Sequence, residues 1–134
     1  MKTLIVNGTL VNEGQTQQAD LLIVNGRIQK IGKDLQSSEA DKVIDAAGKY
    51  VLPGMIDDQV HFREPGLTHK GGLQTESRAA VAGGITSFMD MPNVKPATVT
   101  LKALEEKFAL AQGKCAANYA FYMGATNDNL DELR

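Results

Sequence analysis

The stretch of sequence that decides the fold is Pro53-Gly54-Met55-Ile56-Asp57-Asp58-Gln59-Val60-His61-Phe62-Arg63-Glu64-Pro65-Gly66. Its apolar start predicts a buried β-strand, and its polar end indicates that the strand delivers polar side chains to one end of a barrel. Alternate positions of a strand share one face. Four polar residues fall on such positions: Asp57, Gln59, His61 and Arg63. Polar groups of this kind are costly to bury without a purpose, so this face is the first candidate for a functional site.

The composition is that of an ordinary globular protein. The 134 residues are 43% hydrophobic and 22% charged, which is enough apolar material for one modest core. The net charge of -2, with no stripe of basic residues, argues against nucleic-acid binding. No apolar run of about 18 residues predicts a membrane helix, and the N-terminus does not resemble a signal peptide. The single Cys115 fits a reducing compartment, so we expect a cytoplasmic protein.

Residues 1–53 are predicted to form a small β domain. Two Asn-Gly dipeptides, Asn7-Gly8 and Asn25-Gly26, each lie between β-favouring segments and therefore predict two hairpins. Two more short strands are expected at Lys42–Ala46 and Tyr50–Leu52.

Residues 54–134 alternate between strand and helix patterns. Strands are expected at 55–62, 85–89 and 117–123, and helices at 73–82, 100–112 and 127–134. This alternation predicts parallel βα units, of which a (β/α)8 barrel needs eight and about 250 residues. We therefore expect an α/β fold in which a small β-sandwich-like unit precedes about three βα units of an incomplete TIM-type barrel. A complete three-stranded α/β domain is the alternative, and it is disfavoured because its apolar edges would be exposed.

The candidate metal ligand is His61, at the C-terminal end of the first barrel strand, where barrel enzymes place their active sites. A neutral imidazole is a common zinc ligand, although a histidine can also be buried against a backbone carbonyl. Gln59 would be a weak, neutral ligand. We therefore expect Gln59 and Asp57 to line the site rather than to bind the metal.

Two further residues are candidates for binding an anionic substrate. The guanidinium of Arg63 can bind a carboxylate through two parallel hydrogen bonds. Asn93, just beyond the second strand, offers both a donor and an acceptor. The structural alternatives are a salt bridge from Arg63 to Glu64 or Asp57, and a turn role for Asn93 after Pro92.

Three blocks of the chain, 20–32, 43–66 and 75–93, resemble the cyclic-amide branch of the amidohydrolases. The run His61-Phe62-Arg63-Glu64-Pro65-Gly66 is the most specific of these features, and it resembles the dihydroorotases. The resemblance implies a metal-dependent hydrolase that interconverts N-carbamoyl-L-aspartate and dihydroorotate in pyrimidine biosynthesis. It also implies a TIM-type barrel whose other metal ligands and catalytic acid-base residue lie beyond Arg134. The isolated chain is therefore expected to be inactive.

The resemblance also assigns roles to the site residues. It makes His61 a zinc ligand, and Arg63 and Asn93 the residues that bind the substrate carboxylate. Gln59 stands where the family has the first histidine of a His-x-His pair, so one or two zinc ions are expected and Gln59 argues against the second. Related allantoinases usually carry Asn in place of Arg63, which favours dihydroorotase over allantoinase or hydantoinase.

A second hypothesis comes from another class of protein. Gln59 replaces a metal ligand of the family, as expected in a protein that has lost its metal site. The full-length protein is therefore alternatively a non-catalytic, dihydroorotase-like scaffold that supports aspartate transcarbamoylase. The expected partners are thus a small-molecule substrate and either a second copy of the chain or aspartate transcarbamoylase, with no nucleic acid and no membrane.

Overall fold

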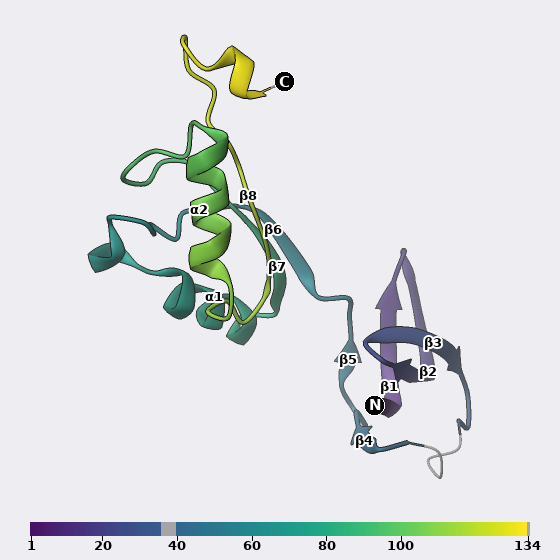
Figure 1. The fold of residues 1–134 in the computed structure, drawn as a ribbon. Coiled ribbons are helices and arrows are strands. Elements are labelled where there is room, and N and C mark those ends of the chain that lie inside the picture. Colours follow the sequence, from purple (N-terminus) through teal and green to yellow (C-terminus); the bar gives the residue numbers. More distant parts are fainter. Residues whose placement is uncertain (36–39, 134) are drawn as a thin grey trace. The chain divides into compact units, whose positions relative to one another are not determined.

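The computed structural model describes residues 1–35 and 40–133 of the chain (Figure 1). They form two compact units, Met1–Pro53 and Gly54–Arg134, and each is described by itself. None of the helices in this described part is long and apolar enough to cross a membrane.

The first unit is a mixed β-sheet. Within the described residues its strands are β1 (Lys2–Asn12), β2 (Gln15–Val24), β3 (Arg27–Gly32), β4 (Lys42–Asp45) and β5 (Tyr50–Val51). The order is β3-β2-β1-β4, and β5 also pairs with β1. The pairs β1–β2 and β2–β3 are antiparallel, whereas β4 and β5 run parallel to β1. The two short strands predicted at 42–46 and 50–52 are therefore confirmed.

Only one of the two predicted Asn-Gly hairpins is present. Asn25-Gly26 joins β2 to β3 with φ values of 49° and 78°, as the hairpin turn requires. Asn7-Gly8 lies inside the continuous strand β1, so the prediction of a hairpin there is wrong. The chain turns instead at Glu13-Gly14, whose φ values are 50° and 71°.

The reason is that Asn7 forms a β-bulge rather than a turn. The register between β1 and β2 shifts between Ile5 and Gly8. Asn7 has a φ of 60°, its backbone N–H donates to Asp20 (3.0 Å), and its side-chain amide donates to Asp45 (3.0 Å). These bonds satisfy the extra residue, and the strand continues beyond it.

The second unit contains three parallel strands and two α-helices among its described residues. The strands β6 (Met55–Val60), β7 (Ile85–Asp90) and β8 (Asn118–Phe121) pair in that order, and the helices are α1 (Leu73–Ala82) and α2 (Leu101–Ala111). Short 3-10 helices lie at Thr68–Lys70 and Leu130–Leu133. The alternating α/β arrangement is thus confirmed (Figure 1).

The predicted helix at 127–134 is wrong in type, because the described residues there contain only the 3-10 helix Leu130–Leu133. The side chain of Asn129 explains the difference. Its amide donates to the carbonyls of Val99 and Gly124 (2.7 Å each), and its Oδ1 accepts from the Thr126 N–H (2.7 Å). These contacts hold the segment as a loop that is bonded to the preceding loops.

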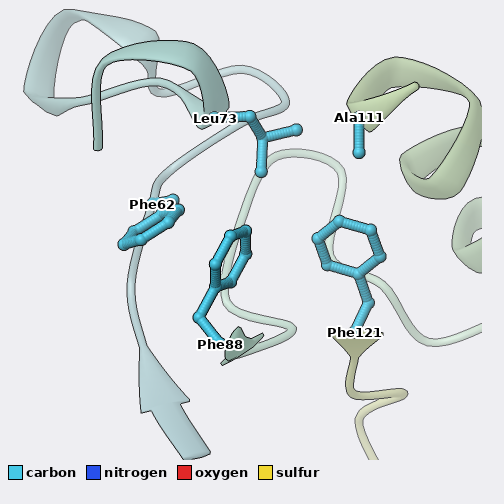
Figure 2. Packing of buried hydrophobic residues seen from close by; sticks show 5 residues of the cluster. All are labelled: Phe62, Leu73, Phe88, Ala111 and Phe121. Atoms are coloured by element: carbon cyan, nitrogen blue, oxygen red, sulfur yellow. The ribbon is translucent and has the colours of Figure 1, made fainter. Parts of the chain in front are cut away.

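The core of the second unit lies between the sheet and the helices. It is built from five buried residues, shown in Figure 2: Phe62, Leu73, Phe88, Ala111 and Phe121. The rings of Phe62 and Phe88 have centroids 4.5 Å apart. Burying such side chains stabilises the fold by roughly 1.5–3 kcal/mol each. This packing fixes the three strands beside one another, and with them the loops that follow the strands.

Candidate functional site

The segments that carry the candidate residues lie side by side because β6 and β7 are parallel. Val60, the last residue of β6, is the register partner of Asp90, the last residue of β7. Just beyond this pair, the N–H of Met91 donates to the carbonyl of Val60 (3.0 Å). The segments 61–63 and 91–93 therefore leave the sheet at the same edge.

His61 and Asn93 are in direct contact at this edge. Nδ1 of His61 lies 2.9 Å from Oδ1 of Asn93, and the imidazole is exposed. An amide oxygen can only accept, so Nδ1 is the donor in this contact, and in the neutral imidazole the lone pair is then on Nε2. Metal-binding histidines commonly have one nitrogen bound to a neighbour in this way while the other binds the metal. The contact is with a side chain rather than with the backbone carbonyl of the structural alternative.

Arg63 joins the same group of residues. Its Nη1 donates to the backbone carbonyl of Asn93 at 3.4 Å. The backbone of Arg63 has a φ of 64°, which is uncommon for a residue other than glycine. The structure thus brings together His61, Arg63 and Asn93, which we call the strand-end cluster.

Glu64 is engaged elsewhere rather than in the salt bridge with Arg63 that was considered from the sequence. Its Oε1 lies 2.7 Å from Nζ of Lys114, and its Oε2 accepts from the N–H of Leu73 (2.9 Å). These contacts anchor the loop after β6 to the start of α1. The guanidinium of Arg63 therefore donates to the carbonyl of Asn93 rather than to Glu64.

The predicted common face of Asp57, Gln59, His61 and Arg63 is interrupted after Asp57, because β6 carries a bulge between Asp57 and Val60. Asp57 pairs with Phe88 and Val60 pairs with Asp90, so three steps on β6 match two on β7. The bulge interrupts the alternation on which the prediction depended. Oδ1 of Asp57 accepts from the backbone N–H of Gln59 (3.1 Å).

Gln59 lines a hollow at the strand ends. The hollow has a volume of about 550 Å³, and its walls come from the ends of all three strands, with Asp58, Met91 and Tyr122 among the lining residues. The amide of Gln59 is exposed and can reach a small molecule there. Asp57 is absent from these walls.

Sequence reasoning missed a buried ion pair beneath the cluster. Nζ of Lys107 lies 2.8 Å from Oδ2 of Asp90, and both side chains have 0% exposure. A signal was present, because Lys107 stands three residues after Leu104 and four before Ala111, on the apolar face of α2. A lysine at such a position requires a buried partner.

The donor set at the cluster fits one position of a metal site. His61 offers Nε2, and Gln59 offers only a neutral amide oxygen, which zinc rarely uses. Within residues 1–35 and 40–133 no three histidine, cysteine or carboxylate side chains gather as a metal-binding group. Within the strand-end cluster, His61 is therefore the one side chain of a type that zinc commonly binds.

Comparison with known proteins gives matches to the amidohydrolase family and to two cyclic amidohydrolases of different names. The model of the amidohydrolase family matches residues 50–132. A dihydroorotase of Methanosarcina acetivorans is 43% identical over 130 residues, which is 97% of this chain and 28% of that protein. An allantoinase of Salmonella choleraesuis is also 43% identical, over 131 residues with the same coverage.

Among solved structures, the chain is similar to another cyclic amidohydrolase. An L-hydantoinase (dihydropyrimidinase) from Arthrobacter aurescens matches 98% of this chain and 29% of its own, with a TM-score of 0.93 and 35% identity. The chain thus spans between a quarter and a third of the length of these relatives.

Proposed function

The chain belongs to the amidohydrolase family, in its cyclic-amide branch, and from this premise we propose that it is the N-terminal part of a dihydroorotase. The whole protein would interconvert N-carbamoyl-L-aspartate and dihydroorotate. The βα units of 54–134 would then begin a TIM-type (β/α)8 barrel, with the strand-end cluster at its active-site edge.

The observation that carries this proposal is the position of Arg63. Its guanidinium donates to the carbonyl of Asn93, whose side chain contacts His61, and it can bind a carboxylate in the bidentate manner. Dihydroorotate carries such a carboxylate on its ring, whereas the ring of allantoin does not. Arg63 and the amide of Asn93 would together hold the substrate by that group.

His61 would hold a zinc ion through Nε2 in the whole protein. When bound, zinc lowers the pKa of a water ligand and polarises the amide carbonyl. In the neutral imidazole, the hydrogen bond from Nδ1 to Asn93 leaves the lone pair on Nε2, which is the nitrogen that would face the metal. Gln59, in the place of a histidine, supports one zinc ion at this position rather than two.

The test is the Arg63→Asn variant of the full-length protein, assayed with dihydroorotate. Loss of charge-assisted hydrogen bonds worth about 1.5–3 kcal/mol predicts a KM raised by roughly tenfold or more, with a smaller change in kcat. Arg78→Asn, which removes an exposed arginine from α1, is the matched control. An unchanged KM for Arg63→Asn would contradict the role of Arg63 in carboxylate binding.

A scaffold without catalytic activity is the second candidate, and Gln59 is the observation that favours it. Such a protein would bind and support aspartate transcarbamoylase, with the strand-end cluster left as a remnant. Turnover of dihydroorotate by the zinc-loaded full-length protein would exclude this candidate. Parallel assays with allantoin and hydantoin separate dihydroorotase from the other activities found among the relatives.

A further inference from the structure

The buried ion pair of Asp90 and Lys107 connects three elements of the second unit. Lys107 is on α2, and its Nζ contacts Oδ2 of Asp90 (2.8 Å) and donates to the carbonyl of Met91 (3.0 Å). The ammonium also lies 4.9 Å from the centroid of the Phe121 ring at the end of β8. Oδ2 of Asp90 has no partner besides this ion pair among the described residues. The lysine therefore fixes the orientation of the Asp90 carboxylate.

The other oxygen of that carboxylate holds the backbone next to His61. Oδ1 of Asp90 accepts from the N–H of Phe62 (2.9 Å), and on the other side of His61 the carbonyl of Val60 accepts from the N–H of Met91 (3.0 Å). His61 is thus bracketed by two hydrogen bonds to the end of β7. Asn93, which contacts the imidazole, follows Met91 by two residues.

Stability alone is a poor explanation for this pair. Removing two charges from water is costly, and well-packed apolar side chains in place of a buried ion pair are often as stable or more so. A carboxylate held by a lysine does what an apolar pair cannot, because it accepts a hydrogen bond at a defined position.

We propose that the pair Asp90–Lys107 positions His61 against Asn93, and so sets both the tautomer of His61 and the direction of Nε2. Asp90 and Lys107 are positioning residues, since neither reaches the exposed side of the cluster. The consequence for zinc rests on the proposed function, whereas the effect on the His61–Asn93 contact does not.

The experiment compares two double variants of the full-length protein. Asp90→Leu with Lys107→Leu removes the ion pair and also the acceptor for the N–H of Phe62. Asp90→Asn with Lys107→Met removes both charges but keeps an oxygen acceptor at residue 90. Lys102→Met is the control on α2, because the side chain of Lys102 is 86% exposed. Single substitutions would leave one buried charge without a partner and would strongly destabilise the fold, so the double variants carry the test.

Two quantities are measured, and neither depends on turnover. Crystal structures give the distance from Nδ1 of His61 to Oδ1 of Asn93, and competition with a chromophoric chelator gives the Kd for Zn²⁺. We expect the leucine pair to remain folded, to lose the 2.9 Å contact and to bind Zn²⁺ about 10-fold or more weakly. The variant that retains the acceptor should keep the contact and lose less than threefold in affinity, and Lys102→Met should change neither.

The outcomes separate the two proposals. An intact His61–Asn93 contact in the leucine pair would overturn the positioning role, whatever the activity of the protein. Equal loss of the contact in both double variants would also overturn the proposed route through the N–H of Phe62. A wild-type protein that does not turn over dihydroorotate would contradict the proposed function, yet the crystallographic comparison would still decide the positioning role.

Discussion

Gly66 shows how closely the loops beyond β6 and β7 approach each other. It has a φ of 78°, and a Cβ added there would overlap the carbonyl oxygen of Lys95. The adjacent N–H of Lys95 donates to the carbonyl of Pro65 (3.2 Å). A backbone oxygen cannot rotate away as a side chain can, so only glycine fits at this crossing.

Replacing Gly66 with alanine should therefore destabilise the second unit through two separate effects. The positive φ alone costs about 1 kcal/mol, and the overlap with Lys95 adds roughly 1–3 kcal/mol. Gly113→Ala is the matched control, because its φ is 73° but the space around it is open. Urea unfolding of both variants measures the free energies of unfolding. Equal losses of unfolding free energy in the two variants would mean that the carbonyl of Lys95 does not restrict residue 66.

The proximity of the residues in the strand-end cluster could be predicted, whereas the path of β6 that leads to them could not. His61, Arg63 and Asn93 end or follow adjacent parallel strands, so topology alone brings them together. The bulge in β6 was not predictable, because the alternating pattern gives no sign of an extra residue. The pairing of Lys107 with Asp90 was also not predictable, because a contact between a helix and a strand has no signature in local sequence.

Glu64 links a loop, a helix start and a turn. It binds the N–H of Leu73 at the start of α1 and Nζ of Lys114 after α2. Burial alone would raise the pKa of this carboxyl, but the hydrogen bond from Lys114, the Leu73 N–H and the charge of Lys114 outweigh burial and lower the pKa. The ionised form is thus the one that the folded chain prefers.

The pH dependence of stability follows from that lowered pKa. The contribution of Glu64 is present above the pKa of an unfolded glutamate, about 4.3, and is lost as the pH falls through the lower folded value. Between pH 6 and pH 3, Glu64→Gln should therefore lose less free energy of unfolding than the wild type does. Glu105→Gln, at an exposed position of α2, should follow the wild type. Parallel curves for Glu64→Gln and the wild type would contradict this account.

At the level of elements, the sequence patterns of the second unit predicted the order of its strands and helices. In the first unit, an Asn-Gly dipeptide did not distinguish a hairpin turn from a β-bulge. Helix α1 has the predicted bounds because Gly83 and Gly84 end it. Asn7-Gly8 and Asn25-Gly26 have the same local chemistry, and tertiary contacts separate them. A Cβ at Gly8 would lie 2.8 Å from Cγ2 of Val51, so this glycine serves the close approach of β5 to β1.

The whole molecule is two units whose described residues contribute a single imidazole to the strand-end cluster. Zinc needs four ligands in most sites, and one histidine supplies little of the binding free energy. The isolated 134-residue chain should therefore bind Zn²⁺ weakly and show no dihydroorotase activity. Equilibrium dialysis against Zn²⁺ measures this, with a His61→Ala variant of the same chain as the control. Tight binding that disappears in His61→Ala would contradict this expectation.

The buried position of Lys107 also makes it a built-in reporter of local opening. Trypsin cleaves after lysine, yet this bond lies within α2 and its side chain is fully covered. Lys102, on the same helix, is exposed and gives a comparison within the same digest. A protease can reach residue 107 only when α2 separates from the sheet, so the rate of that cut follows the opening equilibrium of the helix. The yield of the peptide that ends at Lys107 would thus measure how often α2 separates from the sheet.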